Sequence, residues 1–271
     1  MDHGFTHAAF GKTGLKVHRL GLSATYWPGK KTVYQAIDSG LNFFFCFGID
    51  KQMLAVMRDV LKRDREQYVV ATGAYNLLVG HPSLRRTLEK RLRQLGTDYL
   101  DIFLFLGVTK PEHLPTKTLD ELYRLKEEGR FGYLGISSHD RKFAGRLASE
   151  GALDVLMIRY NAAHRGAEQD IFPHLTPHDP GVIGYTATRW RYLLRRPKKN
   201  WPEGKPVPDA GMCYRFVLSN PHIHVCLTAP SNKKQLAENI AAMEKGPLSQ
   251  EEMHFMREFG DVVYKMKKYF M

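Results

Sequence analysis

The stretch GLNFFFCFGIDK, residues Gly40–Lys51, joins an apolar strand to the start of a helix. Its aromatic run at Asn42–Phe47 is apolar on both faces, which is typical of a strand buried in a parallel sheet. A helical pattern follows at residues 50–62 with almost no linker. Because short apolar runs and helical patterns keep alternating along the chain, this stretch predicts a fold of repeated strand–helix units.

Eight such units can be distinguished. The strands are expected at Val17–Ser23, Asn42–Phe47, Tyr68–Thr72, Tyr99–Leu106, Tyr133–Ser137, Val155–Tyr160, Val182–Thr186 and Ile223–Thr228. The helices are expected near residues 31–39, 50–62, 83–95, 117–128, 140–149, 166–175, 209–219 and 232–243. This order predicts an α/β fold, a single (β/α)8 TIM barrel over residues 1–271. A doubly wound open sheet is the alternative, but its fingerprint G-x-G-x-x-G is absent after the first strand.

Two further pieces lie outside these units. AAFGKTGLKV, residues 8–17, predicts an N-terminal hairpin that turns at Lys12–Gly14. Ser249 and Glu252 form a capping box, which predicts the start of an extra C-terminal helix. Its apolar stripe includes Met256 and Phe259, so we expect this helix to pack on the barrel.

The composition restricts the class of protein. With 43% hydrophobic residues the chain can bury a large core. No run approaches the ~18 apolar residues of a membrane span, so we expect a soluble, cytoplasmic protein with no membrane partner. The formal net charge of +12 is compatible with an anionic cofactor, with nucleic acid or with simple solubility.

The cysteines and histidines do not indicate a metal site. Cys46, Cys213 and Cys226 lack metal-motif spacing and are too few for a disulfide framework. His222, His224 and Cys226 alternate along the last expected strand and share a face, so they could approach one Zn²⁺. Their spacing is wide for a single ion and leaves the fourth ligand unidentified. We therefore expect core packing there and no metal.

Four motifs, met in order along the chain, resemble the aldo-keto reductase superfamily. They are FGKTGLKVHRLGLSA (10–24), TDYLDIFLFL (97–106), KEEGRFGYLGIS (126–137) and CLTAPSNKKQLAENIAAM (226–243). The last is closest to the form found in potassium-channel beta subunits. The resemblance covers nearly the whole chain, and it implies a barrel oxidoreductase that binds NADP(H) and acts on a small-molecule substrate.

The resemblance also implies that the catalytic tetrad is substituted. In register, the family's Asp, Tyr, Lys and His fall on Phe45, Asp50, Gly73 and Leu106. The family's tyrosine donates a proton as hydride arrives, and positioned acid catalysis of this kind is worth ~10²–10⁴-fold. We therefore expect an unactivated ketone to react poorly, unless another residue supplies the proton.

Polar residues beyond other strand ends could supply that proton. His164, in the cluster YNAAHRG (160–166), is the first candidate and Tyr75, two residues after Gly73, is the second. His139 and Arg159 are further polar residues that follow or end expected strands.

The positions that bind the cofactor in the family are better retained than the positions of the tetrad. Adenosine contacts are implied for Ser231, Asn232, Lys233, Gln235, Glu238 and Asn239. Tyr185 matches the aromatic residue that stacks on nicotinamide. Ser137 and Ser138 match the Ser-Asn pair that holds the carboxamide, whereas the family's Gln becomes Met157. A helix N-terminus beside Lys233 suits a phosphate, although an ordinary capped helix is the alternative.

The loop TRWRYLLRRPKKNWPEGKPVP, residues 188–208, is strongly basic, with aromatic residues interleaved. In the family this loop folds over the pyrophosphate, so the resemblance assigns Arg189 to the cofactor. Single-stranded nucleic acid would also suit this composition, and a solvated loop is the third interpretation.

Three functional hypotheses follow. The first is an NADP(H)-dependent oxidoreductase with a non-standard proton donor. The second is a non-catalytic NADP(H)-binding regulatory or sensor protein that acts through a partner protein. The third, a barrel that binds RNA or another polyanion, is the least favoured. Turnover of a substrate would separate the first from the others, and steeply salt-dependent RNA binding would favour the third.

Overall fold

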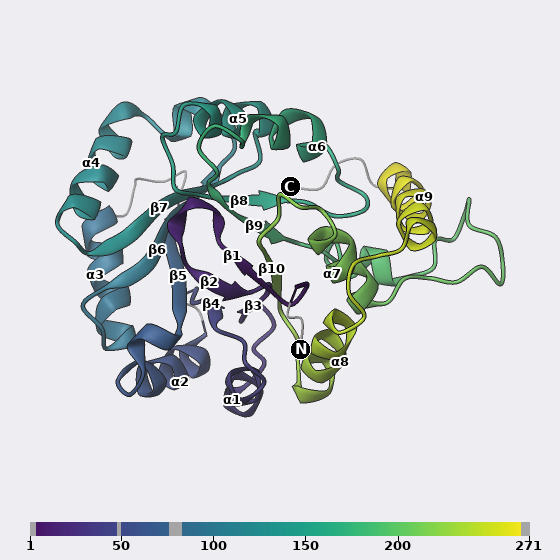
Figure 1. Cartoon of the computed structure of the whole chain (residues 1–271), viewed down its shortest axis with the longest axis horizontal. Helices are drawn as coiled ribbons and strands as arrows, with labels where there is room; N and C mark the ends of the chain where they lie inside the picture. Colours follow the sequence, from purple (N-terminus) through teal and green to yellow (C-terminus); the bar gives the residue numbers. More distant parts are fainter. Residues whose placement is uncertain (1–3, 48–49, 76–82, 267–271) are drawn as a thin grey trace.

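Eight parallel strands form a closed barrel in the computed structural model, which describes residues 4–47, 50–75 and 83–266 (Figure 1). They are β3 (Leu20–Ser23), β4 (Phe43–Phe45), β5 (Val69–Tyr75), β6 (Leu100–Val108), β7 (Phe131–Ser138), β8 (Val155–Arg159), β9 (Gly181–Tyr185) and β10 (Val225–Thr228). Because β10 pairs with both β9 and β3, the sheet has no free edge. The predicted (β/α)8 barrel is confirmed.

Helices surround the barrel and follow the strands. The α-helices are α1 (Lys30–Asp38), α2 (Lys51–Leu61), α3 (Leu84–Leu95), α4 (Thr116–Glu127), α5 (Arg141–Ser149), α6 (Ala167–Asp170), α7 (Ala210–Leu218), α8 (Lys233–Met243) and α9 (Gln250–Met266). The short 3-10 turns are η1 (Gly11–Thr13), η2 (Arg65–Gln67), η3 (Pro111–His113), η4 (Phe172–His174) and η5 (Tyr192–Leu194). The single helix predicted at 166–175 is wrong. It divides into α6 and η4, because Pro173 cannot continue an α-helix.

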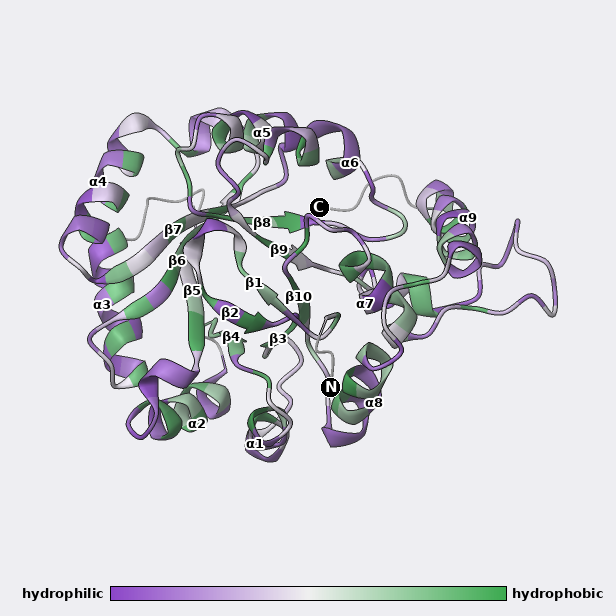
Figure 2. Cartoon of the chain, in the orientation of Figure 1, coloured by the Kyte–Doolittle hydropathy of each residue, from purple (hydrophilic) through white to green (hydrophobic). Residues whose placement is uncertain are grey.

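The strands separate their side chains into two apolar layers. Phe43 and Phe45 point into the barrel, where they join Leu104 and Met157. Phe44 points outward, into the layer between the sheet and the helices. Figure 2 shows apolar residues along much of the strands, and apolar and polar residues interspersed along the surrounding helices. The aromatic run at residues 43–45 is therefore buried on both faces, as a barrel strand requires.

A hairpin of β1 (His7–Ala9) and β2 (Lys16–His18) lies across the N-terminal end of the barrel (Figure 1). Phe10 is fully buried among the inner barrel residues, and its ring centroid lies 5.7 Å from that of Phe43. The Tyr133 hydroxyl donates to the carbonyl of Thr13 at 2.6 Å. The predicted hairpin is confirmed, and it seals the end of the barrel opposite to the C-terminal ends of the strands.

The single strand predicted at Val17–Ser23 is wrong, because the chain divides there into β2 and β3. Arg19 lies between the two strands and is nearly buried. Its guanidinium donates to the carbonyls of Leu218 and Ile223 at 2.7 and 2.8 Å. These bonds hold the turn where the chain leaves the hairpin and enters the barrel beside β10.

The C-terminal helix α9 begins as predicted. The Glu252 amide donates to the Ser249 hydroxyl at 3.1 Å, and the Ser249 amide donates to the Glu252 carboxylate at 2.8 Å, which completes the capping box. Met256 and Phe259 are fully buried against the rest of the molecule. Over residues 4–47, 50–75 and 83–266, no helix combines the length and the apolar character needed to cross a membrane.

Candidate active site at the C-terminal end of the barrel

The last inward-facing residue of each strand defines the mouth of the barrel. By alternation with the inner barrel residues, these are Ser23, Phe45, Tyr75, Leu106, Ser137, Arg159, Tyr185 and Leu227. The C-terminal end of a (β/α)8 barrel is where chemistry takes place in enzymes of this fold. Apolar and aromatic side chains dominate the mouth, and Arg159 carries the one charge among these eight positions.

An aromatic wall covers the side of the mouth near β4 and β5. The rings of Phe45 and Phe47 stack with their centroids 6.2 Å apart, and Phe47 meets Tyr75 edge-on at 5.1 Å. Phe45 is nearly buried, whereas Tyr75 is 44% exposed. Burial raises the pKa of the Tyr75 hydroxyl, so this group stays protonated at neutral pH.

Gly73, in β5, has no room for a side chain. A Cβ atom there would lie 2.2 Å from the backbone oxygen of Leu104 and 2.9 Å from Cγ of Leu106. The first of these contacts is with backbone, which rotamer changes cannot relieve. Leu106 itself is buried beside Gly73. Gly73 and Leu106, which the motifs align with the lysine and histidine of the tetrad, thus pack against each other in an apolar contact.

Asp50 acts as the N-cap of α2. Its carboxylate accepts hydrogen bonds from the amides of Gln52 and Met53 at 2.8 and 3.2 Å. Only 3% of the residue is exposed. Its negative charge also favours the positive end of the helix dipole. This geometry gives Asp50 a structural role at the start of the helix.

The two predicted proton donors lie on different sides of the mouth, separated by β6 and β7. His164 follows β8, where its backbone forms a bridge with Asn161 and its Nδ1 lies 3.3 Å from the Asn161 Oδ1. Its ring meets Tyr264 of α9 edge-on at 5.5 Å. Burial, followed by the nearby arginines, lowers the pKa of His164 to about 3. A neutral imidazole is a weak acid, so Tyr75 is the better placed donor of the two.

A small cavity of about 10 Å³ opens where the ends of β7 and β8 meet, and we call it the rim cavity. It is lined by Ser138, His139, Arg141, Ile158, Arg159, His164, Gly166 and Ile171. The Tyr185 hydroxyl lies 3.3 Å from Nε2 of His139. Nδ1 of His139 is buried and has no hydrogen-bond partner in the described part of the chain.

The predicted adenosine contacts lie at the exposed N-terminus of α8, with one exception. The Asn232 side chain caps the helix by accepting from the Gln235 amide at 3.0 Å. Lys233 is exposed beside this cap. Ser231 and Glu238 are also exposed. Oε1 of Glu238 lies 3.9 Å from Nζ of Lys234. Asn239 instead is buried.

The amide of Asn239 donates to the hydroxyl of Thr228 at 3.0 Å, and Thr228 donates in turn to the hydroxyl of Tyr214. The first bond attaches α8 to the end of β10, and the second attaches the end of β10 to α7. Asn239 therefore positions the helix in this structure, while the other five residues face solvent.

The predicted nicotinamide contacts lie on opposite faces of the sheet, because successive side chains of a strand alternate in direction. Ser137 faces the mouth, where its hydroxyl accepts from the Gly107 amide at 2.9 Å. The Ser138 hydroxyl faces away and donates to the carbonyls of Val108 and Asp140. Tyr185 faces the mouth at the end of β9, and burial raises its pKa to about 12. The structure thus brings Ser137 and Tyr185 to the mouth and leaves Ser138 outside it.

The loop after β9 makes an unusual left-handed turn. Arg189, Trp190 and Arg191 all have positive φ, a conformation that costs an L-residue ~1–2 kcal/mol. The turn buries Arg189, whose guanidinium donates to the carbonyl of Val263 in α9. In this conformation Arg189 faces α9 and not the mouth. The resemblance, in contrast, predicts that Arg189 contacts the cofactor at the mouth.

The same turn exposes Trp190, whose ring meets Tyr26 edge-on at 6.4 Å. Tyr26 follows β3 and Trp190 follows β9, while β10 lies between these strands in the barrel. The Tyr26–Trp190 pair therefore bridges two loops beyond the end of β10. Tyr26 could not be identified from local sequence, because its contact with Trp190 spans 164 positions.

The distal part of the basic loop is fixed to α9. Lys205 pairs with Glu258 at 2.7 Å, and Trp201 meets Phe259 edge-on at 4.8 Å. Exposed Lys198 and Lys199 lie between these anchors and η5. The loop is therefore held in place and still presents positive charge to solvent.

The histidines near β10 take part in packing and backbone hydrogen bonds. Nδ1 of His224 accepts from the amide of Val182 at 3.0 Å, His222 stacks on Phe172, and Cys226 is fully buried. Within the described residues, no group of three or more His, Cys, Asp or Glu side chains is arranged to hold a metal ion.

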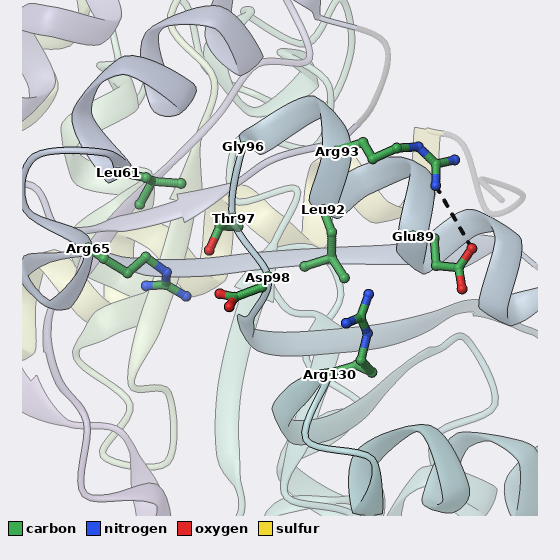
Figure 3. A pocket seen from close by; sticks show the side chains of 9 residues that line it. All are labelled: Leu61, Arg65, Glu89, Leu92, Arg93, Gly96, Thr97, Asp98 and Arg130. Atoms are coloured by element: carbon green, nitrogen blue, oxygen red, sulfur yellow. Dashed lines mark ion pairs between the residues drawn. The ribbon is translucent and has the colours of Figure 1, made fainter.

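A larger cavity lies at the opposite end of the barrel. It measures about 670 Å³ and is lined by Leu61, Arg65, Glu89, Leu92, Arg93, Gly96, Thr97, Asp98 and Arg130 (Figure 3). These residues precede β5, β6 and β7 or lie on α2 and α3. Arg65 is already paired with Asp101 at 2.8 Å. Because chemistry in this fold belongs to the other end, we do not assign the active site to this cavity.

Known proteins share this fold and much of its sequence pattern. A model of the Aldo/keto reductase family matches residues 30–201. The uncharacterized oxidoreductase YqkF of Bacillus subtilis is 22% identical over 288 residues, covering 90% of this chain and 92% of its own. The NADH-specific methylglyoxal reductase of Escherichia coli K12 is 22% identical over 320 residues, covering 93% and 98%.

Solved structures agree with the fold. The holo form of the aldo-keto reductase AKR11C1 from Bacillus halodurans has a TM-score of 0.76 at 20% identity, over 94% of this chain and 96% of that chain. An aldo/keto reductase from Klebsiella pneumoniae, in complex with NADP and acetate, has a TM-score of 0.73 at 22% identity, over 94% and 95%. The family model covers more than half of the chain, and the fold extends the likeness to both ends of the barrel. The chain belongs to the Aldo/keto reductase family of oxidoreductases.

Proposed function

We propose that this protein is an NADP(H)-dependent oxidoreductase whose proton donor lies outside the usual tetrad of its family. The observation that carries this proposal is the contrast at the mouth of the barrel. Tyr185 ends β9 and the exposed N-terminus of α8 follows the neighbouring β10. Phe45 and Leu106 belong to the apolar inner layer and Gly73 packs against Leu106, so none of these three positions carries an acid.

The cofactor would lie along the ends of β10 and β9. The exposed N-terminus of α8, with Lys233 beside its cap, suits the adenosine 2′-phosphate, because free amides and a cation both attract an anion. Tyr185 would stack on the nicotinamide, and the Tyr26–Trp190 pair would cross above the pyrophosphate between them. Ser137 faces this region, whereas Met157 offers no amide to hold the carboxamide.

Tyr75 is the proton donor that the geometry favours over His164. Bound NADPH would supply hydride, and the Tyr75 hydroxyl would supply a proton to the acceptor at the mouth. Tyr75 has no lysine to lower its pKa, since Gly73 and Leu106 fill that region. It would be a weak acid, which suits acceptors that need little acid catalysis, such as imines, quinones or activated alkenes.

A second candidate is a non-catalytic protein that binds NADP(H) and reports its state to a partner protein. The aromatic wall at Phe45, Phe47 and Tyr75 favours it, because these rings occupy the side of the mouth where the family holds its acid. A polyanion-binding role rests only on the exposed lysines of the basic loop.

Fluorescence titration with NADPH and with NADH tests the cofactor. We expect saturable binding with NADPH preferred, and we expect Lys233→Ala to weaken NADPH by about tenfold while leaving NADH nearly unchanged, since a charged hydrogen bond is worth ~1.5–3 kcal/mol. Lys245→Ala, an exposed lysine at the other end of the same helix segment, is the control. Failure of the wild-type protein to bind either nucleotide would refute the proposal.

An acceptor screen with NADPH then separates the enzyme from the sensor. If quinones, imines or activated alkenes are reduced, Tyr75→Phe should lower kcat by ~10²-fold at most without changing NADPH affinity, because acceptors that need little acid catalysis gain least from the hydroxyl. If His164→Gln lowers kcat by that factor and Tyr75→Phe does not lower it, the proton donor is His164 and not Tyr75. NADPH binding without turnover of any acceptor would favour the sensor.

A further inference from the structure

Positive charge gathers around the rim cavity. Arg141 and Arg159 line it, and Arg189 lies nearby. Burial, and then the field of Arg159, lowers the pKa of His139. His164 is affected in the same way by burial and by all three arginines. Both histidines are therefore neutral at physiological pH, and the guanidinium groups carry the charge.

The arginines are crowded as well as partly buried. Burial lowers the pKa of Arg159, and the neighbouring Arg141 contributes in the same direction. Burial and then Arg159 lower the pKa of Arg189. Asp170 pairs with Arg141 at 2.7 Å, on the side of α6. Like charges brought together away from bulk water raise the energy of the folded protein, and a bound anion would offset this cost.

His139 adds a neutral donor to the same cavity. The Tyr185 hydroxyl is protonated at neutral pH and lies 3.3 Å from Nε2 of His139. If Nε2 accepts this proton in a hydrogen bond, the neutral ring carries its own hydrogen on Nδ1. Nδ1 is the buried atom without a partner in the described part of the chain. A buried N–H group of this kind requires an acceptor, which water or an anionic oxygen can supply.

Arg159 belongs both to the lining of the cavity and to the mouth of the barrel. It ends β8 at an inward-facing position and pairs in register with Tyr185 of β9. Met157, one inward-facing position earlier, is apolar and nearly buried. A volume of about 10 Å³ accepts a single water molecule, and thus a single carboxylate oxygen, while the rest of a ligand would remain in the mouth. Apolar surroundings strengthen the attraction between the guanidinium of Arg159 and a carboxylate.

We propose that Arg159 and His139 form a recognition site for an anionic oxygen of the acceptor, so that the substrate of this protein is a carboxylate. One carboxylate oxygen would enter the rim cavity and accept from Nδ1 of His139, while Arg159 would neutralise the charge. The proposal rests on the proposed function, because it places the acceptor at the same mouth as the nicotinamide. It selects negatively charged acceptors among those that react without strong acid catalysis.

Calorimetric titration of the full chain with acetate and with acetamide tests this site, first alone and then with saturating NADPH. The two probes have nearly the same shape and differ in charge. We expect acetate to bind at least tenfold more tightly than acetamide. Arg159→Gln should abolish this preference, Arg159→Lys should keep part of it, and Arg124→Gln, on the exposed surface of α4, should leave it unchanged.

Equal affinity of the wild-type protein for acetate and acetamide would overturn the proposal without any variant. So would an Arg159→Gln protein that keeps the preference for acetate but loses NADPH affinity tenfold, because the anionic oxygen would then belong to the cofactor's phosphates. Acetate binding that depends on Arg159 in a protein that does not bind NADPH would support the anion site and refute the proposed oxidoreductase. The melting temperature of each variant shows that it is folded.

Discussion

Single residues explain how the mouth of this barrel differs from the motif pattern of its family. Asp50 stands where the motifs place the tyrosine, and Oδ1 of its carboxylate caps α2 by accepting from the amides of Gln52 and Met53. Gly73 and Leu106 stand where they place lysine and histidine, and they form one tight contact. Each of these three residues has a structural role of its own, so we expect that introducing a single residue of the family's tetrad would not build the family's site.

Replacing Asp50 should affect stability more than function. Asp50→Ala removes the N-cap of α2 and should lower the free energy of unfolding by ~0.5–2 kcal/mol. Asp50→Asn keeps a capping oxygen and should recover most of this loss. Urea unfolding of both variants checks the prediction, with NADPH titration alongside. A large loss of NADPH affinity in Asp50→Asn would instead show that the carboxylate acts at the mouth.

Gly73→Ala should destabilise the barrel by ~1–3 kcal/mol or more, because the new Cβ would lie 2.2 Å from the Leu104 oxygen. The double variant Gly73→Ala, Leu106→Ala distinguishes backbone from side-chain crowding. If the backbone contact dominates, the second substitution adds the cost of a cavity and gives no rescue. Urea unfolding of the single and double variants measures the coupling. Recovery of stability in the double variant would mean that Leu106 alone limits the space.

Secondary-structure elements follow local signals where those signals are strong. The capping box at Ser249 formed as predicted, and the hairpin turn predicted at Lys12–Gly14 formed at Gly11–Thr13, with Gly14 as its left-handed end. Two predictions failed where the chain changes direction within an apolar run. Pro173 divides the helix expected at 166–175, and Arg19 separates β2 from β3 by bonding to carbonyls 199 and 204 positions away.

The junction of β2 and β3 should make the protein sensitive to acid. Burial is the main cause that lowers the pKa of His18 to about 4. The unfolded chain binds a proton near pH 6.5, so the folded state loses stability as the pH falls from about 6.5 toward 4. His18 alone should account for up to about 3 kcal/mol of this loss.

Urea unfolding between pH 7 and pH 4 measures this effect. His18→Gln should have a flatter pH dependence than the wild-type protein, whatever its stability at pH 7. His254→Gln, at an exposed histidine of α9, is the matched control. Identical slopes for the wild-type protein and His18→Gln would show that another group governs the acid response.

The whole molecule brings distant loops together around the proposed cofactor path. The order β9-β10-β3 places the loops after β9 and β3 on either side of the end of β10. The left-handed turn at Arg189–Arg191 exposes Trp190 so that it reaches Tyr26. Strained backbone of this kind persists only where the surrounding structure holds it, here through Arg189 and α9.

Trp190→Ala should accelerate release of NADPH by about 2–10-fold, because an aromatic pair is worth ~0.5–1.5 kcal/mol. Stopped-flow displacement of bound NADPH measures the rate. Tyr34→Ala, an exposed aromatic residue on α1, is the control and should leave release unchanged. Unchanged release from Trp190→Ala would mean that the Tyr26–Trp190 pair does not close over the cofactor.

The barrel, its hairpin, its extra helix and its family could all be predicted from the order of residues. Apolar periodicity, capping pairs and turn residues act over a few positions, and a motif keeps its letters in the order of the chain. The positions of Tyr75, Tyr185 and the α8 N-terminus at the C-terminal end of the barrel follow from the same order, because strand ends carry the site in this fold.

Other features depended on packing between distant segments. The turning of Arg189 toward α9, the burial of Asn239, the contact of His139 with Tyr185 and the 2.2 Å limit at Gly73 each depend on a neighbour far away in sequence. Local patterns place a residue on a strand end and on a face. Only the closed sheet, with its stagger between strands and its surrounding helices, sets which atoms then meet and which remain free to bind a ligand.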